Sequence, residues 1–204
     1  DSSSRRMEDI ENLLRILFGV WTKSVREGEM SHYINDINSA GEWARLDHQA
    51  RLVGNATGLL PASFDKMKFT TILDVGCGPG RWALDIAADR PNAWVTGIDV
   101  SRDLVNYANA RARTQQLDTL TFRVQDVLAR DLPFPEGSFD LIHVRFAVGW
   151  VKGYATWLLL LARCDTLLKP GGWVVLTEGE GIYTTSNALE RLQEMLCAAL
   201  HVGG

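Results

Sequence analysis

The sequence predicts a doubly wound α/β domain with a mainly parallel, Rossmann-like sheet, preceded by a helical segment. From Thr70 onward, short apolar runs alternate with helix-length segments, whereas the stretch before Thr70 has only helical periodicity. Of the 204 residues, 46% are hydrophobic and 23% are charged, which are ordinary values for a globular chain with a sizeable core. Strands that alternate with helices are joined by right-handed crossovers, so we expect parallel strands covered on both faces.

Residues 1–68 are predicted to form a helical cap. Apolar side chains recur every three or four residues from Ile10 to Val25, as on one face of an amphipathic helix. A second helical run extends from about Trp43 to Val53 and ends before Gly58. We expect the cap to act as a lid over a ligand, although its first helix could instead form a homodimer contact, since its aromatic side chains need burial.

Residues 69–204 are predicted to form the core. We expect strands at 71–75, 94–98, 120–124, 141–145 and 173–177. Helices are expected at about 81–89, 103–115 and 154–168, with a last one from about residue 187. Ser101 is placed to cap the second core helix, and the run Lys-Pro-Gly-Gly at 169–172 predicts a turn before the fifth strand.

The charge and the cysteines limit the classes of partner. There are 21 Lys and Arg against 25 Asp and Glu, a net charge of −4, whereas a protein that binds nucleic acid normally carries a basic excess. The longest apolar run, Trp157 to Ala162, is too short to span a bilayer, so we expect no membrane partner. Cys77, Cys164 and Cys197 lack paired or metal-ligand spacing and no signal peptide is visible, which predicts a cytoplasmic protein without a metal site.

The stretch from Leu73 to Gly80 carries the strongest functional signal. Gly76, Gly78 and Gly80 lie between the first predicted strand and the first core helix. Glycines at this point allow a tight turn and let a ligand approach the backbone closely. The N–H groups at the start of the helix can also meet polar or anionic ligand atoms.

Two acids follow at the ends of the next two predicted strands. Asp99 lies 23 residues after Gly76, where a carboxylate can accept hydrogen bonds from both hydroxyls of an adenosine ribose. Asp126 follows the third strand and can accept a hydrogen bond from the exocyclic amine of adenine. Either acid alone could be a solvated loop residue or a helix cap. The ordered set of a glycine loop and two acids favours a nucleoside cofactor.

In these motifs the chain resembles the class I S-adenosylmethionine-dependent methyltransferases. The loop has Gly-x-Gly-x-Gly spacing, rather than the Gly-x-Gly-x-x-Gly of dinucleotide dehydrogenases, and Asp74 precedes it. The resemblance continues through Phe-Asp-Leu-Ile-His-Val-Arg at 139–145 and Leu-Lys-Pro-Gly-Gly-Trp at 168–173. A full core of this family has seven strands. Because only five are recognisable, we expect residues 1–204 to lack the final antiparallel pair, as in a truncated or shortened form.

The resemblance implies S-adenosylmethionine as the cofactor and S-adenosylhomocysteine as the product. It implies that the glycine loop passes along the methionine part, that Asp99 holds the ribose and that Asp126 binds the adenine edge. The implied cofactor positions are Asp74, Gly76, Cys77, Gly78, Gly80, Asp99, Val100, Asp126, Val127 and Val144.

The cap bears a looser likeness to those of methyltransferases related to secondary metabolism. This likeness implies that Tyr33, Arg45 or Gln49 reaches the methionine carboxylate. A surface pair between Glu42 and Arg45, three residues apart on a helix, is an equally good interpretation.

A general base is not evident. Methyl transfer from a sulfonium is an in-line displacement with a good leaving group, so alignment and exclusion of water can supply much of the rate. Glu178 and Glu180, at the end of the fifth strand, are the acidic candidates, and His143 is the histidine candidate, although a core histidine is favoured there. Many family members have a histidine just after the fourth strand, where this chain has Gly149.

The predicted acceptor is a small molecule, with secondary metabolism as its setting. Phe146 and Trp150 are expected to line its pocket, together with His32 from the cap. The acidic net charge favours a small acceptor, as does the absence of an Asn/Asp-Pro-Pro-Tyr motif at 144–147. Two alternatives stay open: a protein that binds the cofactor without turnover, and an NAD-dependent oxidoreductase, which the loop spacing disfavours.

Overall fold

The computed structural model describes residues 40–178. The amphipathic run at 10–25, His32, Tyr33 and Glu180 lie outside the described residues. The last predicted helix and the proposed lack of a final strand pair also lie outside them. These expectations, and the division into a cap and a core at residue 68, stay predictions.

A five-stranded parallel sheet forms the centre of the molecule, as the sequence predicts. Its strands are β1 (Thr71–Val75), β2 (Trp94–Asp99), β3 (Leu120–Val124), β4 (Phe139–Arg145) and β5 (Leu168–Thr177), in the spatial order β3-β2-β1-β4-β5. The chain order reverses between β1 and β4, which are direct neighbours. In open parallel sheets, ligands bind at this reversal, outside the carboxyl ends of the strands.

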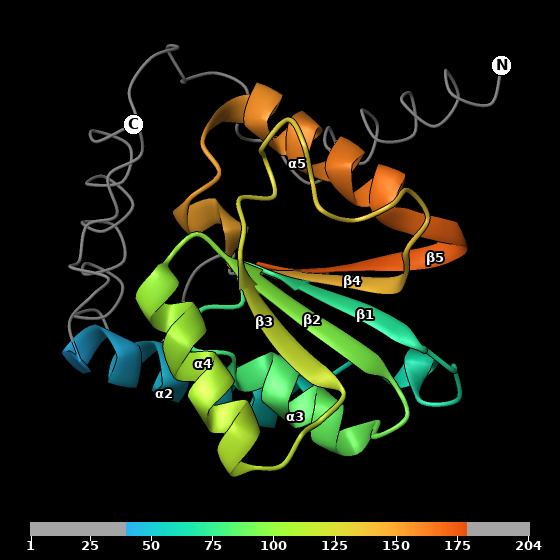
Figure 1. Cartoon of the computed structure of the whole chain (residues 1–204). Helices are drawn as coiled ribbons and strands as arrows, with labels where there is room; N and C mark the ends of the chain where they lie inside the picture. The colour runs from blue at the N-terminus through green and yellow to red at the C-terminus, as the bar shows by residue number, and fades with distance from the viewer. Residues whose placement is uncertain (1–39, 179–204) are drawn as a thin grey trace, which may run out of the picture.

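Helices cover both faces of the sheet. α3 (Arg81–Asp89) and α4 (Arg102–Thr114) lie on one face together with α2 (Ala40–Thr57), and α5 (Gly153–Leu167) lies on the other (Figure 1). Short 3₁₀ turns, η1 (Ala62–Phe64) and η2 (Ala147–Gly149), complete the described elements. The Ser101 hydroxyl accepts the N–H of Leu104 at 3.3 Å, which confirms the predicted cap of α4.

No helix within residues 40–178 has the length and apolar character needed to cross a bilayer.

The strands are apolar on both faces because each face is buried. Ile72 of β1 packs with Trp82 of α3, while Leu73 and Val75 pack with α5 residues such as Leu160. All five side chains are at most 3% exposed. Alternation along β1 therefore directs Asp74 to the same face as Ile72, toward α3.

The structure corrects one local prediction. The run 169–172 does not precede the fifth strand but lies inside β5, which begins at Leu168. Leu168 is opposite Phe139 and Trp173 is opposite Leu141, so residues 169–172 oppose the single residue Asp140. Gly171 has φ +80°, a conformation that favours glycine. The turn chemistry therefore produces a bulge rather than a strand start.

Candidate functional site

The glycine loop joins β1 to α3 and needs its glycines for two different reasons. Gly76, Gly78 and Gly80 have φ values of +65°, +54° and +80°. A Cβ on Gly80 would lie 2.6 Å from the Phe122 ring, so this glycine allows α3 to pack closely on the sheet. A Cβ on Gly78 would meet no atom within 4 Å. The surroundings of Gly78 are therefore open to a ligand.

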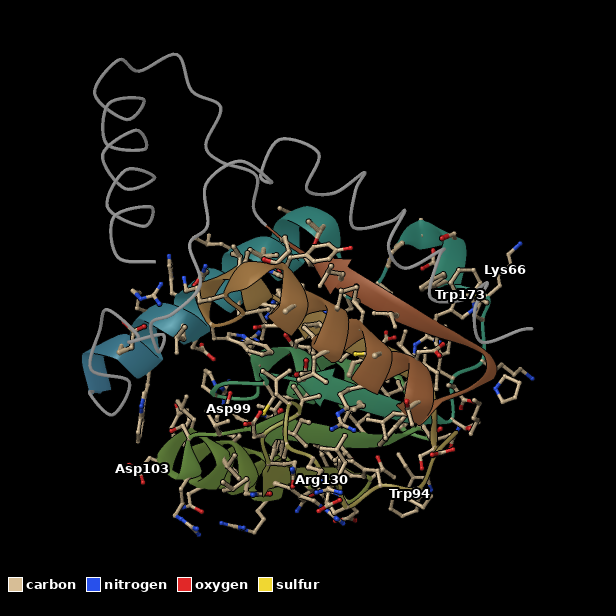
Figure 2. All side chains as sticks on the ribbon, turned by 90° about the horizontal axis from the view of Figure 1, so that it is seen from above. Lys66, Trp94, Asp99, Asp103, Arg130 and Trp173 are labelled. Atoms are coloured by element: carbon tan, nitrogen blue, oxygen red, sulfur yellow. The ribbon has the colours of Figure 1, made fainter. Side chains whose placement is uncertain are left out.

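Asp99 fixes this loop from the end of β2. One carboxylate oxygen accepts the N–H of Gly78 at 2.9 Å, and the other accepts the N–H of Ser101 at 2.9 Å. The N–H of Cys77 also donates to the carbonyl oxygen of Ile98 at 3.0 Å. Figure 2 shows Asp99 at the opposite end of β2 from Trp94. Asp99 therefore ties the glycine loop to the carboxyl edge of β2.

The carboxylate of Asp99 can still bind a ligand. A carboxylate offers about four lone-pair sites, and the two backbone N–H groups use two of them. Burial raises the pKa of Asp99, and its hydrogen bonds from Ser101 and Gly78 oppose that rise. Two further O–H donors would stabilise the charged form in the same way as these N–H groups.

Behind the loop, Asp74 and His143 form a buried pair across β1 and β4. The Nδ1 of His143 lies 2.8 Å from one carboxylate oxygen of Asp74, and each residue is 2% exposed. The imidazole stacks on the Trp82 indole, with ring centroids 3.7 Å apart. The second Asp74 oxygen has no hydrogen-bond partner, although it is buried. A buried carboxylate oxygen without a partner is costly, so the site lacks one donor.

The remaining positions implied by the family differ in their placement. Val100 is 65% exposed at the end of β2, whereas the side chains of Val127 and Val144 are buried in the core. Asp126 is exposed, and its carboxylate accepts the N–H of Leu128 at 2.8 Å. Val127 and Val144 can therefore meet a cofactor only through their backbone.

Cys77 is a packing residue in this structure. It is 9% exposed, and burial raises its pKa well above the ordinary value, as do the nearby charges of Asp74 and Asp99. The thiol is therefore protonated at neutral pH, and the loop contains no activated cysteine nucleophile.

The turn after β4 is strained and held from β5. Phe146 has φ +55°, a left-handed conformation that is unusual for an aromatic residue. Its N–H donates to the carbonyl oxygen of Thr177 at 2.9 Å. The Glu178 carboxylate accepts the N–H of Ala147 at 2.6 Å and that of Val148 at 3.4 Å. Backbone strain of this kind gathers at functional sites, where surrounding contacts maintain it.

Two of the three predicted base candidates lie within the described residues, and both occupy structural positions. Glu178 binds the N–H groups that begin η2, and His143 is enclosed between β1, β4 and α3. Burial raises the pKa of Glu178, while its backbone hydrogen bonds oppose the rise. Their catalytic roles stay predictions.

The predicted pocket residue Trp150 lies against the glycine loop. A Cβ on Gly76 would be 3.4 Å from its indole ring, so the tryptophan and the loop backbone are in close contact. Trp150 and Phe146 are both partly buried. They bring aromatic surface to the carboxyl ends of β1 and β4.

Arg45 is engaged with a neighbour on α2. Its guanidinium forms two hydrogen bonds to Glu42, at 2.8 and 2.6 Å, and a third to Gln49 at 3.1 Å. Glu42 is buried, which strengthens the pair. The predicted pair between Glu42 and Arg45 therefore forms, although its carboxylate is buried rather than exposed, and binding of a methionine carboxylate by Arg45 stays a prediction.

Sequence reasoning assigned no role to Arg145, the last residue of β4. It is partly buried at the carboxyl edge, next to Phe146. An arginine at the end of a central parallel strand was the available signal, because strand ends at this edge face the ligand crevice.

The fold and the loop geometry define a Rossmann-like domain built to bind a nucleoside cofactor. Residues 72–172 match a family described as a methyltransferase domain. This match covers about half of the chain, and the fold is that of the class I S-adenosylmethionine-dependent methyltransferases. The cofactor of this family is S-adenosylmethionine.

Known proteins resemble the chain over part of their length. Methyltransferase str3 of Strobilurus tenacellus is 32% identical over 138 residues, which are 67% of this chain and 45% of that protein. A demethylmenaquinone methyltransferase of Lactococcus lactis is 33% identical over 109 residues, 53% of this chain and 41% of that protein. The secondary metabolism regulator LAE1 of Cochliobolus heterostrophus is 41% identical over 104 residues, which are 50% of this chain and 30% of that protein. The chain thus spans less than half of each relative.

A solved structure shares the fold at greater coverage. The S-adenosylmethionine-dependent methyltransferase from Aquifex aeolicus superposes with a TM-score of 0.55 at 19% identity, covering 83% of this chain and 88% of that one. At this identity the likeness supports the fold alone.

Proposed function

We propose that this protein transfers a methyl group from S-adenosylmethionine to a small-molecule acceptor. The observation that carries the proposal is the open turn at Gly78, whose N–H is fixed by the carboxylate of Asp99. This arrangement exposes loop backbone and a carboxylate side by side, as a nucleoside with a polar tail requires. When bound, the cofactor supplies a methyl group on a positively charged sulfur that is also a good leaving group.

The described residues fit such a cofactor. Asp99 has lone pairs left for two ribose hydroxyls, and the exposed side chain of Val100 offers an apolar face for the adenine. The orphaned oxygen of Asp74 can accept from the amino group of the methionine part, directly or through a water molecule. Trp150 and Phe146 can exclude water from the carboxyl ends of β1 and β4 and align the acceptor.

Three observations support a small acceptor in a cytoplasmic setting. The net charge of −4 disfavours a polyanion such as nucleic acid. Cys77 and Cys164 are free and buried, as expected in a reducing compartment. Among the relatives, one name states demethylmenaquinone as an acceptor and another states secondary metabolism.

A cofactor-binding protein without turnover is the second candidate. The observation in its favour is that Glu178 and His143 both serve structural contacts. Transfer of label from S-[methyl-³H]adenosylmethionine to any small molecule of a metabolite extract separates the two candidates. Sustained transfer identifies an enzyme, and binding without transfer identifies a binding protein.

Cofactor identity is tested by thermal unfolding with S-adenosylhomocysteine and with NAD. A ligand at about 100 times its dissociation constant adds about 2.7 kcal/mol to the free energy of unfolding. For a chain of this size, that corresponds to a Tm increase of about 5–10 °C. We expect S-adenosylhomocysteine to produce it, D99N to remove most of it and D103N to keep it. Asp103 is an exposed acid in the first turn of α4, four residues after Asp99 (Figure 2). Stabilisation by NAD alone would overturn the proposed cofactor.

A further inference from the structure

Arg145 places a positive charge at the centre of the ligand-binding edge. It ends β4, the strand that pairs with β1 where the chain order reverses, and it is opposite Thr177 of β5. Side chains alternate along a strand, so Arg145 lies on the same face as His143, toward α3. The glycine loop leaves β1 at this same edge. Arg145 therefore lies at the edge of the sheet where ligands bind in folds of this kind.

No carboxylate of the described residues forms an ion pair with this charge. Within residues 40–178 the guanidinium forms no hydrogen bond or ion pair, and its described contact is the Phe146 ring, 5.8 Å from Cζ to the ring centroid. Burial lowers the pKa of Arg145, and the more distant charges of Asp74 and Asp85 oppose that change. Asp85 pairs with Arg81, and Asp74 is bound to His143 through one oxygen while its second oxygen has no partner.

Three other partly buried arginines have a carboxylate partner, whereas Arg163 of α5, like Arg145, has none among the described residues. Arg81 pairs with Asp85 at 2.7 Å, Arg111 with Asp47 at 2.7 Å and Arg90 with Asp89 at 3.6 Å. A partly desolvated charge without a partner is unfavourable, and protein interiors usually avoid it. An anion that arrives with the substrate would remove this cost at Arg145. The planar guanidinium offers five donors in a fork that matches a carboxylate or another acidic oxygen.

We propose that Arg145 binds the anionic oxygen of the methyl acceptor, and so selects carboxylic acids, acidic phenols or enols. This inference rests on the proposed function. The aromatic surfaces of Phe146 and Trp150 would receive the apolar body of such an acceptor, since both lie at the same edge.

The proposal also accounts for the absence of an obvious base among the described residues. An acceptor that binds as an anion has already lost its proton to solvent. Its oxygen lone pair forms the O–CH₃ bond, while the electron pair of the S–CH₃ bond returns to sulfur, and the two opposite charges disappear. No protein side chain must remove a proton, so Arg145 replaces the general base by stabilising the ionised acceptor.

The test is a binding measurement in three variants. R145Q removes the charge, R145K keeps a charge without the planar fork, and R130Q removes a charge from an exposed position in the loop after β3. Calorimetry first measures S-adenosylhomocysteine, whose affinity we expect to stay within about twofold in every variant. If the wild-type protein does not bind S-adenosylhomocysteine, that result contradicts the proposed function and not the role of Arg145. Circular dichroism checks that each variant is folded.

The second step titrates matched pairs of acid and amide into the protein saturated with S-adenosylhomocysteine. The probes are 4-hydroxybenzoate with 4-hydroxybenzamide, and cinnamate with cinnamamide. We expect the wild type and R130Q to bind an acid about tenfold more tightly than its amide, as a charged hydrogen bond implies. R145Q should reduce this preference to about twofold or less, and R145K should keep part of it.

Two outcomes would overturn the proposal. The first is a wild-type protein that binds none of the acids, or binds them no better than their amides. The second is a weaker affinity of R145Q for S-adenosylhomocysteine, together with an unchanged affinity for the analogue of S-adenosylhomocysteine that lacks the methionine carboxylate. That pattern would assign the guanidinium to the methionine carboxylate of the cofactor rather than to the acceptor.

Discussion

Two aspartates at opposite ends of the sheet have opposite surroundings. Asp140, at the amino end of β4, accepts the backbone N–H and hydroxyl groups of Thr70 and Thr71 at 2.6–3.1 Å, and the Nζ of Lys169 at 3.0 Å. Asp74, at the carboxyl end of β1, has one partner, and its second oxygen has none. The amino end is therefore satisfied by the protein itself, and the carboxyl end is left one donor short.

This difference indicates how the domain separates stability from function. The Asp140 cluster joins the beginnings of β1, β4 and β5 by hydrogen bonds that the folded chain completes alone. At the other end, Phe146 is strained, Gly78 is open and Arg145 lacks a counter-ion among the described residues. Natural proteins concentrate such violations at functional sites. Four substitutions test this separation.

The largest loss of stability is expected for G80A. The added Cβ would meet Phe122 at 2.6 Å and Ala108 at 2.8 Å, and φ is +80°. Overpacking and left-handed strain together predict a decrease of about 2–4 kcal/mol in the free energy of unfolding, measured in urea. G78A is the matched control, with φ +54° but no atom within 4 Å, and should lose only about 1 kcal/mol. Equal losses would contradict the division of the loop into packing and ligand-facing glycines.

Next in size is D140N at the amino end. Loss of the charged hydrogen bonds with Lys169 and the two threonines predicts a decrease of about 2 kcal/mol at pH 7. These hydrogen bonds hold the pKa of Asp140 far below its ordinary value, despite the opposing effect of burial. Its contribution is therefore complete above about pH 4 and is lost as the pH falls through the folded-state pKa. D118N, at an exposed acid, is the control.

Urea unfolding at pH 7 and pH 3 measures the predicted dependence for D140N. The difference between wild type and D140N should be smaller at pH 3. A difference that grows on acidification would show that the Asp140 carboxylate does not supply the stability of the amino end.

D74N should change cofactor affinity more than stability, which is the reverse of the result expected for D140N. Its single hydrogen bond with His143 can be kept by the amide oxygen, and the buried charge it removes is only partly compensated. We expect a loss of about 1 kcal/mol or less, with a decrease of about tenfold in affinity for S-adenosylhomocysteine. A stability loss larger than that of D140N, with cofactor affinity unchanged, would remove the contrast between the two ends of the sheet.

The sequence predicts the order of elements well because its signals are local. Apolar runs placed all five strands, and Ser101 correctly marked the start of α4. The run 169–172 was misplaced because turn chemistry does not reveal whether the paired strand continues past a bulge. Contacts between distant segments, such as Glu178 with the N–H of Ala147, depend on register and have no local signature. For the same reason, the lack of a counter-ion for Arg145 within residues 40–178 was not predictable from its neighbours in sequence.

The smallest effect on stability is expected for E178Q. Burial raises the pKa of Glu178, so its ionised form is stabilised less than that of an exposed glutamate, although two N–H groups oppose the rise. Protonated Glu178 therefore contributes to the free energy of unfolding at low pH, and this contribution is lost as the pH rises through the folded-state pKa. At pH 7 the amide oxygen can still accept from Ala147 and the partly buried charge is removed, so we expect the free energy of unfolding to change by no more than about 0.5 kcal/mol. The same variant tests the catalytic prediction for Glu178, because an isosteric amide cannot accept a proton from the acceptor. If E178Q retains methyl transfer, the role of Glu178 is limited to holding the turn after β4. If E178Q loses methyl transfer at unchanged stability, Glu178 is the base, and the case for an acceptor that binds already ionised is weakened.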